Sequence, residues 1–90
     1  MPSYLVETYL ARGQSEERLA CDLRARSAAE ELTQGTMRFR FDHSIHVPED
    51  EICFYVFDAP SARDAAHAAQ RAGLDPIRVV EAVPSGKEQA

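Results

Sequence analysis

The segment from Glu51 to Asp58 (EICFYVFD) constrains the fold of this chain more than any other. Its apolar side chains fall on both parities, whereas a strand with one solvated face alternates apolar and polar residues. Such a strand is central in its sheet, and both of its faces need a cover. Helices of the same chain can cover one face, but a chain of 90 residues has little left for the other. We therefore expect a homodimer that packs sheet to sheet.

The other segments predict the order β-α-β-β-α-β. Alternating β-forming residues indicate further strands at 3–9, 36–47 and 77–83, and helices are expected at 16–34 and 62–72. Ser15 is the expected N-cap of the first helix, and its expected apolar stripe is Leu19, Leu23, Ala28 and Leu32. This order predicts an α+β, ferredoxin-like fold: a four-stranded antiparallel sheet with both helices on one face, of the dimeric α+β barrel type. Residues 1–84 form the expected single domain, and 85–90 a flexible tail.

Charge and composition exclude several classes of partner. Fifteen acidic and ten basic residues give a net charge of −5, which argues against binding nucleic acid or an anionic membrane. No apolar run approaches the roughly 20 residues of a membrane span, and no signal peptide is recognisable. The two cysteines, Cys21 and Cys53, lie far apart in a helix pattern and a strand pattern. A cytoplasmic protein with reduced thiols is expected.

Four stretches resemble the actinobacterial-type DUF4242 family, which includes a nickel-binding ferredoxin-like protein. They are Tyr4-Leu5-Val6-Glu7, His43-Ser44, Phe57-Asp58-Ala59-Pro60 and the segment 71–79 (RAGLDPIRV). The resemblance implies the ferredoxin-like fold and a divalent transition metal such as nickel. Family members tend to carry a histidine in each helix, whereas the first helix here offers only Cys21, and His67 in the second is shifted. Tyr55 stands where the family commonly has a cysteine on the third strand.

Two of the three histidines, His43 and His46, lie three residues apart in one expected strand. Side chains three apart in a regular strand point to opposite faces, so one metal takes both only if a β-bulge intervenes. His43 shares the parity of Phe41 and Ile45, so it is expected to point inward, either as a core histidine or as a ligand or acid–base group. His46 falls on the polar parity and is expected at the surface. His67, in the alanine-rich second helix, is expected to be exposed or at the helix edge.

Glu7 is a carboxylate in an expected central strand, where it must be paired, hydrated or at a dimer interface. It is either the ion-pair partner of Arg38, Arg40 or Arg78, or a ligand or base. Cys53, Tyr55 and Phe57 share one parity and are either plain core or, if they face away from the helices, the lining of a cleft that Glu7 could join.

Three functions are compatible with these residues. The first is a non-catalytic dimeric binding module that holds nickel or another divalent transition metal by His43, His46, His67 and Glu7, since imidazole suits nickel, copper and zinc alike. The second is a cofactor-free isomerase or cyclase for a small hydrophobic metabolite, with Glu7, His43 and Tyr55 as proton carriers in a dimer cleft. The third is an accessory dimer with no site.

Overall fold

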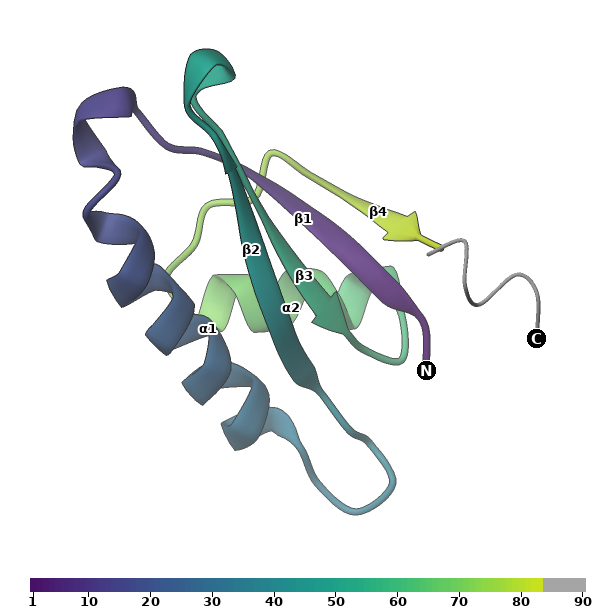
Figure 1. Cartoon of the computed structure of the whole chain (residues 1–90). Helices are drawn as coiled ribbons and strands as arrows, with labels where there is room; N and C mark the ends of the chain where they lie inside the picture. Colours follow the sequence, from purple (N-terminus) through teal and green to yellow (C-terminus); the bar gives the residue numbers. More distant parts are fainter. Residues whose placement is uncertain (84–90) are drawn as a thin grey trace.

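The computed structural model describes residues 1–83, in which two helices pack on one face of a four-stranded sheet (Figure 1). All strand pairs are antiparallel, and the strand order is β2-β3-β1-β4. The elements are β1 (Ser3–Tyr9), α1 (Glu17–Leu32), β2 (Arg40–Val47), β3 (Ile52–Asp58), α2 (Ala62–Arg71) and β4 (Arg78–Ala82). The predicted ferredoxin-like α+β fold is confirmed, while the expected tail at 85–90 lies outside the described residues.

The core lies between the sheet and the helices and combines small helix residues with aromatic strand residues. The helices contribute alanines, which let their backbones approach the sheet closely. Phe57 is fully buried, and the centroid of its ring lies 5.4 Å from that of Phe41 on the edge strand β2. Tyr55 is 1% exposed, with its ring centroid 6.2 Å from that of Phe41.

Helix α1 packs only half of its expected stripe against the sheet: Ala28 is buried and Leu32 is partly buried against the core, as expected. Its buried residues are Cys21, Ala25, Ala28 and Ala29. Leu19 and Leu23 are 68% and 58% exposed, so their assignment to the buried stripe was wrong. Leu19 precedes the buried Cys21 by two residues, and Leu23 precedes the buried Ala25 by two. Each leucine therefore lies about 200° around the helix axis from a buried residue. The expected cap was also wrong, because the hydroxyl of Ser15 donates to the carbonyl of Arg12 and caps no amide of α1.

Helix α2 begins and ends as the sequence predicts. The hydroxyl of Ser61 accepts a hydrogen bond from the backbone N–H of Asp64 at 3.1 Å, as an N-cap residue does. After the helix, Gly73 has φ +80°, a conformation that costs other residues more than glycine. The N–H of Leu74 donates to the carbonyl of Ala69 at 2.9 Å and completes this glycine-dependent termination.

Strand β3 has two apolar faces, as predicted. Cys53, Tyr55 and Phe57 point toward the helices and are buried. Ile52, Phe54 and Val56 alternate with them and therefore point to the other side of the sheet. No helix of the described chain packs against that second side, which we call the open face.

Candidate functional site: a histidine on the open face of the sheet

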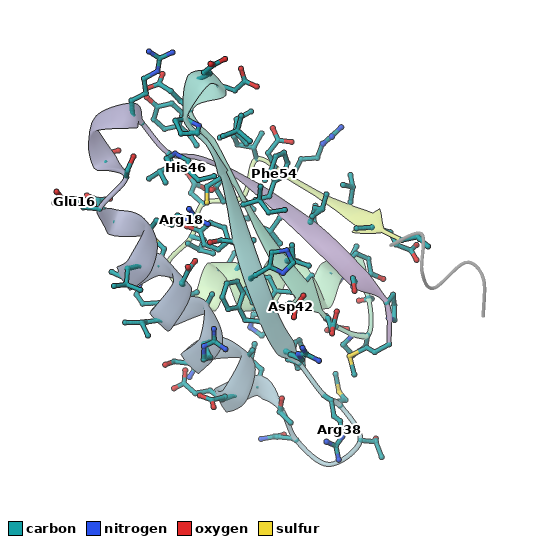
Figure 2. All side chains as sticks on the ribbon, in the orientation of Figure 1. Glu16, Arg18, Arg38, Asp42, His46 and Phe54 are labelled. Carbon is teal, nitrogen blue, oxygen red and sulfur yellow. The ribbon has the colours of Figure 1, made fainter. Side chains whose placement is uncertain are left out.

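The open face carries an apolar surface that spans all four strands. Cross-strand pairing puts Leu5 of β1 opposite both Val56 of β3 and Val80 of β4. The next row joins Phe54 of β3 to Ile45 of β2, which is 44% exposed. Figure 2 shows Phe54 and Asp42 on the side of the sheet turned to the viewer. Apolar faces of this kind are common where proteins bind partners or ligands.

A pocket of about 450 Å³ lies on this face, near the end of the sheet where β1 begins. The buried Val56 and the half-buried Leu5 make up its apolar floor, and the exposed side chains of Arg40, Asp42 and His43 lie around it. It is lined by Ser3, Leu5, Arg40, Asp42, His43, Ile45, Val56, Asp58, Ala82 and Val83. The volume is in the range of small-molecule sites, and the mixture of an apolar floor with a few polar groups is typical of them.

His43 is the titratable group in this pocket with the most defined geometry. Its Nδ1 lies 2.9 Å from Oδ2 of Asp42, whose other oxygen accepts a hydrogen bond from Arg40 at 3.0 Å. The side chains of His43 and Asp42 are 54% and 38% exposed, so the pair is open to solvent. A carboxylate on Nδ1 fixes the orientation of the ring and leaves Nε2 available to a metal or a proton.

The inward orientation expected for His43 was wrong, and a β-bulge is the reason. Phe41 pairs with Phe57, but the next paired residue, His43, pairs with Val56, so Asp42 is an extra residue. The bulge reverses the parity of the strand after it. Ser44 therefore faces the helices and is 8% exposed, while His43 and Ile45 face away.

His43 and His46 lie on opposite faces, as strand geometry predicts. The bulge precedes both residues, so it exchanges their faces without bringing the rings together. His46, expected at the surface, points to the helix side, and its Nε2 is buried with no hydrogen-bond partner among the described residues. Figure 2 shows His46 and Arg18 together between β2 and α1. One metal ion in this fold cannot take both histidines of the same chain.

Beneath α1, the bulged strand meets a group of polar side chains. Arg18 donates from Nε to the hydroxyl of Ser44 and from Nη2 to its carbonyl, both at 2.9 Å. Asp22, one turn further along α1, has a buried Oδ1 that finds no partner within residues 1–83. An unpaired buried polar atom costs about 1–3 kcal/mol, so this side of β2 carries an energetic cost.

Tyr55 points to the helix side and cannot join Glu7 and His43 on the open face. Its side chain is buried with Cys21 and Cys53, and both cysteines are free thiols. Burial raises the pKa of Tyr55 well above its ordinary range, and the two thiols beside it raise that pKa further. Burial likewise raises the pKa of Cys53. These groups stay neutral and act as core, and the cleft in which Cys53 and Tyr55 would face a partner sheet is not formed.

Glu7 does face the open side, with Arg78 as its partner. Its carboxylate lies 3.5 Å from Nε of Arg78 on β4, which confirms one of the ion pairs expected from sequence. Glu7 and His43 lie on the same face, but strand β3 runs between them. Glu7 pairs with Phe54 and His43 with Val56, so they are also offset by two residues along the strands. Strand spacing puts them about 12 Å apart, too far to act on one atom.

His67 lies on an exposed position of α2, as expected, far from β2 in the fold. Over residues 1–83, no three His, Cys, Asp or Glu side chains come together as a metal-binding group would require. The four expected metal ligands, Glu7, His43, His46 and His67, are therefore distributed over three surfaces of one copy. Of the candidate catalytic and metal-binding residues named from sequence, His43 alone lines this pocket.

Two residues of the site were not foreseen from sequence. Asp42 orients His43, and Arg18 holds the strand that carries it. The sequence signal for Asp42 is its position directly before a histidine in an expected strand. A bulge at that position turns both side chains to the same side of the strand. Arg18 carries no such signal, because its partner Ser44 lies 26 residues away and on the face opposite to the expected one.

Comparisons with known proteins identify the fold. No family model matches the sequence, and no curated protein matches it. The chain is similar in structure to SCO4226 from Streptomyces coelicolor A3(2), with a TM-score of 0.61 and 15% sequence identity. The similarity covers 92% of this chain and 98% of that one. Neither helix within residues 1–83 is long and apolar enough to cross a membrane. At this level of identity the shared property is the ferredoxin-like fold.

Proposed function

We propose that this protein is a homodimeric binding module whose ligand lies between the open faces of two copies, held by His43. The observation that carries the proposal is an oriented histidine at the rim of a pocket on an otherwise apolar sheet face. The cytoplasm is the compartment that fits its free thiols and acidic surface.

The occupant that best fits the open face is a second copy of the chain. Its centre is apolar, and each end carries both signs of charge: Glu7 with Arg78 at one end, Asp42 with Arg40 at the other. When two identical faces pack together, each charged end of one copy can therefore find an opposite charge on the other copy. This holds whichever way the two copies are oriented. A domain of this size also has a thin core, and dimerisation is a common source of additional stability.

The dimensions of the face are compatible with a small stable interface. Four strands about 4.8 Å apart, with about seven residues at about 3.3 Å each, make a surface of roughly 19 by 23 Å. Two such surfaces bury about 900 Å² in projection, and side-chain relief raises this toward the roughly 1,200 Å² of the smallest stable interfaces. Exposed Tyr9 and Val83 extend the apolar surface at its borders.

The ligand class we favour is a divalent transition metal, nickel among them. A histidine that ligates a metal through one nitrogen usually donates its other ring N–H to a carboxylate, which is the arrangement of His43 and Asp42. One copy offers too few ligands within residues 1–83, so a bound ion would draw on both copies, and His43 of each is the leading candidate. The resemblance to the DUF4242 family, which includes a nickel-binding protein, supports the same class.

Calorimetric titration of tag-free protein with Ni²⁺ tests this function. One ion per two chains is expected, with an affinity that falls at least 10-fold in His43→Ala. His67→Ala is the matched control, because that histidine is exposed on α2, and it should bind as the unaltered protein does. Equal affinities in His43→Ala and His67→Ala, or no saturable binding at all, would reject the metal proposal.

A second candidate is a cofactor-free acid–base enzyme, an isomerase or cyclase for a small hydrophobic metabolite. The observation in its favour is the same Asp42–His43 hydrogen bond, which orients an imidazole as a general base over an apolar floor. Because Tyr55 and Glu7 are separated from His43, this enzyme would use His43 alone. Protein-observed NMR with small apolar compounds tests it, with His43→Gln used to assign the His43 ring signals by their loss; if no compound shifts those signals in the unaltered protein, the enzyme proposal fails.

A further inference from the structure

We propose that Arg18 is a positioning residue: from the helix side of the sheet it selects the strand register that presents His43 on the open face. Nε and Nη2 of Arg18 donate to the hydroxyl and the carbonyl of Ser44, the first residue after the bulge that faces α1. The register claim stands on these contacts alone. Its consequence for the ligand rests on the proposed function.

Strand β2 has a second register available. If the pairing of Phe41 with Phe57 continued without a bulge, His43 would lie opposite Tyr55, and Ile45 opposite Cys53. Both side chains would then point toward α1, because a shift of one residue exchanges the two faces. The loop between β2 and β3 would shorten from four residues, 48–51, to three, which hairpins also accommodate. The site on the open face would lose its histidine.

The amino-acid pattern favours that second register. Phe41, His43, Ile45 and Val47 share one parity, so regular alternation would bury Ile45 and expose His46 to water. The observed register instead leaves Ile45 44% exposed and the Nε2 of His46 buried without a partner among the described residues. A contact outside the pattern must offset these costs. The double hydrogen bond from Arg18 on α1 reaches Ser44, two residues after the extra residue Asp42.

A second anchor holds the hairpin tip but not the bulge. Arg12 donates its backbone N–H to the Glu51 carboxylate at 3.1 Å and its side chain to the carbonyls of Pro48 and Glu49 at 3.3 Å. Glu51 has φ 54°, a conformation that is strained for a residue other than glycine. The four-residue loop is thus itself under strain, so the loop alone does not fix the register of β2. The hydrogen bonds from Arg18 to Ser44 hold the strand in that register.

The test follows Ile45 and His43 by NMR in the full chain. In Arg18→Met, we expect the His43–Val56 cross-strand contacts to weaken and His43–Tyr55 contacts to appear. At protein concentrations below the dimer dissociation constant, where Ile45 is 44% exposed, the relaxation of its methyl groups by a soluble paramagnetic probe should fall several-fold. Arg18→Lys, which keeps the charge but loses the two-point geometry, should give an intermediate result. A folded Arg18→Met protein with unchanged contacts and unchanged Ile45 relaxation would overturn the proposal.

Deletion of Asp42 provides the matched control. Without the extra residue, Phe41 and His43 are consecutive, and regular alternation keeps His43 opposite Val56 whether or not Arg18 is present. Arg18→Met should therefore leave Ile45 relaxation unchanged in the deletion background; an equal fall in both backgrounds would show a general structural role and overturn the proposal. If Arg18→Met fails to fold, Arg18→Lys gives the same comparison. A register change accompanied by unaltered Ni²⁺ binding would keep the role of Arg18 and reject the proposed site instead.

Discussion

Replacing Ile45 by threonine tests whether the open face is an interface. Threonine keeps the β-branched shape that suits a strand but removes apolar surface. Ile45 is 44% exposed in one copy, so that fraction of its side chain remains to be buried by a partner. Complete burial of an isoleucine contributes about 1.5–3 kcal/mol, so the remaining fraction contributes about 0.7–1.3 kcal/mol.

A two-fold dimer counts that contribution twice, which gives about 1.3–2.6 kcal/mol for each dimer. The dimer dissociation constant should therefore rise about 10- to 80-fold in Ile45→Thr. Sedimentation velocity over a concentration series measures this constant directly. The free energy of unfolding of the monomer should also fall, by up to about 0.8–1.7 kcal/mol, because the remaining 56% of the side chain (100 − 44) is already buried in one copy.

Leu19→Thr is the control for this experiment. Leu19 is 68% exposed on the outer side of α1, away from the proposed interface, and should leave the dissociation constant unchanged. The reasoning is refuted if the unaltered protein sediments as a monomer at all concentrations. It is equally refuted if Leu19→Thr weakens the dimer as much as Ile45→Thr does.

Three further predictions concern stability. Phe57→Ala should lower the free energy of unfolding by about 3–5 kcal/mol in urea, because the ring is fully buried against Phe41; a loss below about 1 kcal/mol would contradict this packing. Ser61→Ala should cost about 1 kcal/mol by removing the N-cap of α2, while Ser61→Asp should retain most of it. Because the folded state raises the pKa of Tyr55, the unfolded chain releases the Tyr55 proton first, so stability should decline as pH rises through 10.0, its ordinary pKa. Tyr55→Phe should remove most of that decline in thermal melts, and a slope equal to that of the unaltered protein would contradict it.

Local patterns predicted the element order and most element boundaries. The two-sided apolar character of β3 placed it at the centre of the sheet, and Ser61 and Gly73 marked the ends of α2. These features depend on residues close together in the chain, so they can be recognised without tertiary contacts. The orientation of α1 did not follow, because small residues such as Ala25 pack against the sheet more closely than leucine allows.

The candidate site divides in the same way. Sequence identified His43 as a residue of interest and placed it on the face opposite to that of His46, and both conclusions hold. It assigned each of them to the wrong face, because a single extra residue at Asp42 reverses the parity of the strand beyond it. It also grouped Tyr55 with Glu7, two residues that lie on opposite sides of the sheet.

The amino-acid sequence by itself determined the ferredoxin-like order of strands and helices and the need for a cover on both faces of β3. Periodicity suffices for this, since it records which faces of each element avoid water. Only the tertiary structure decided that His43, and not His46, lies in the pocket of the open face. That choice depends on the pairing register of β2, which Arg18 influences through its contacts with Ser44, 26 residues away in the chain.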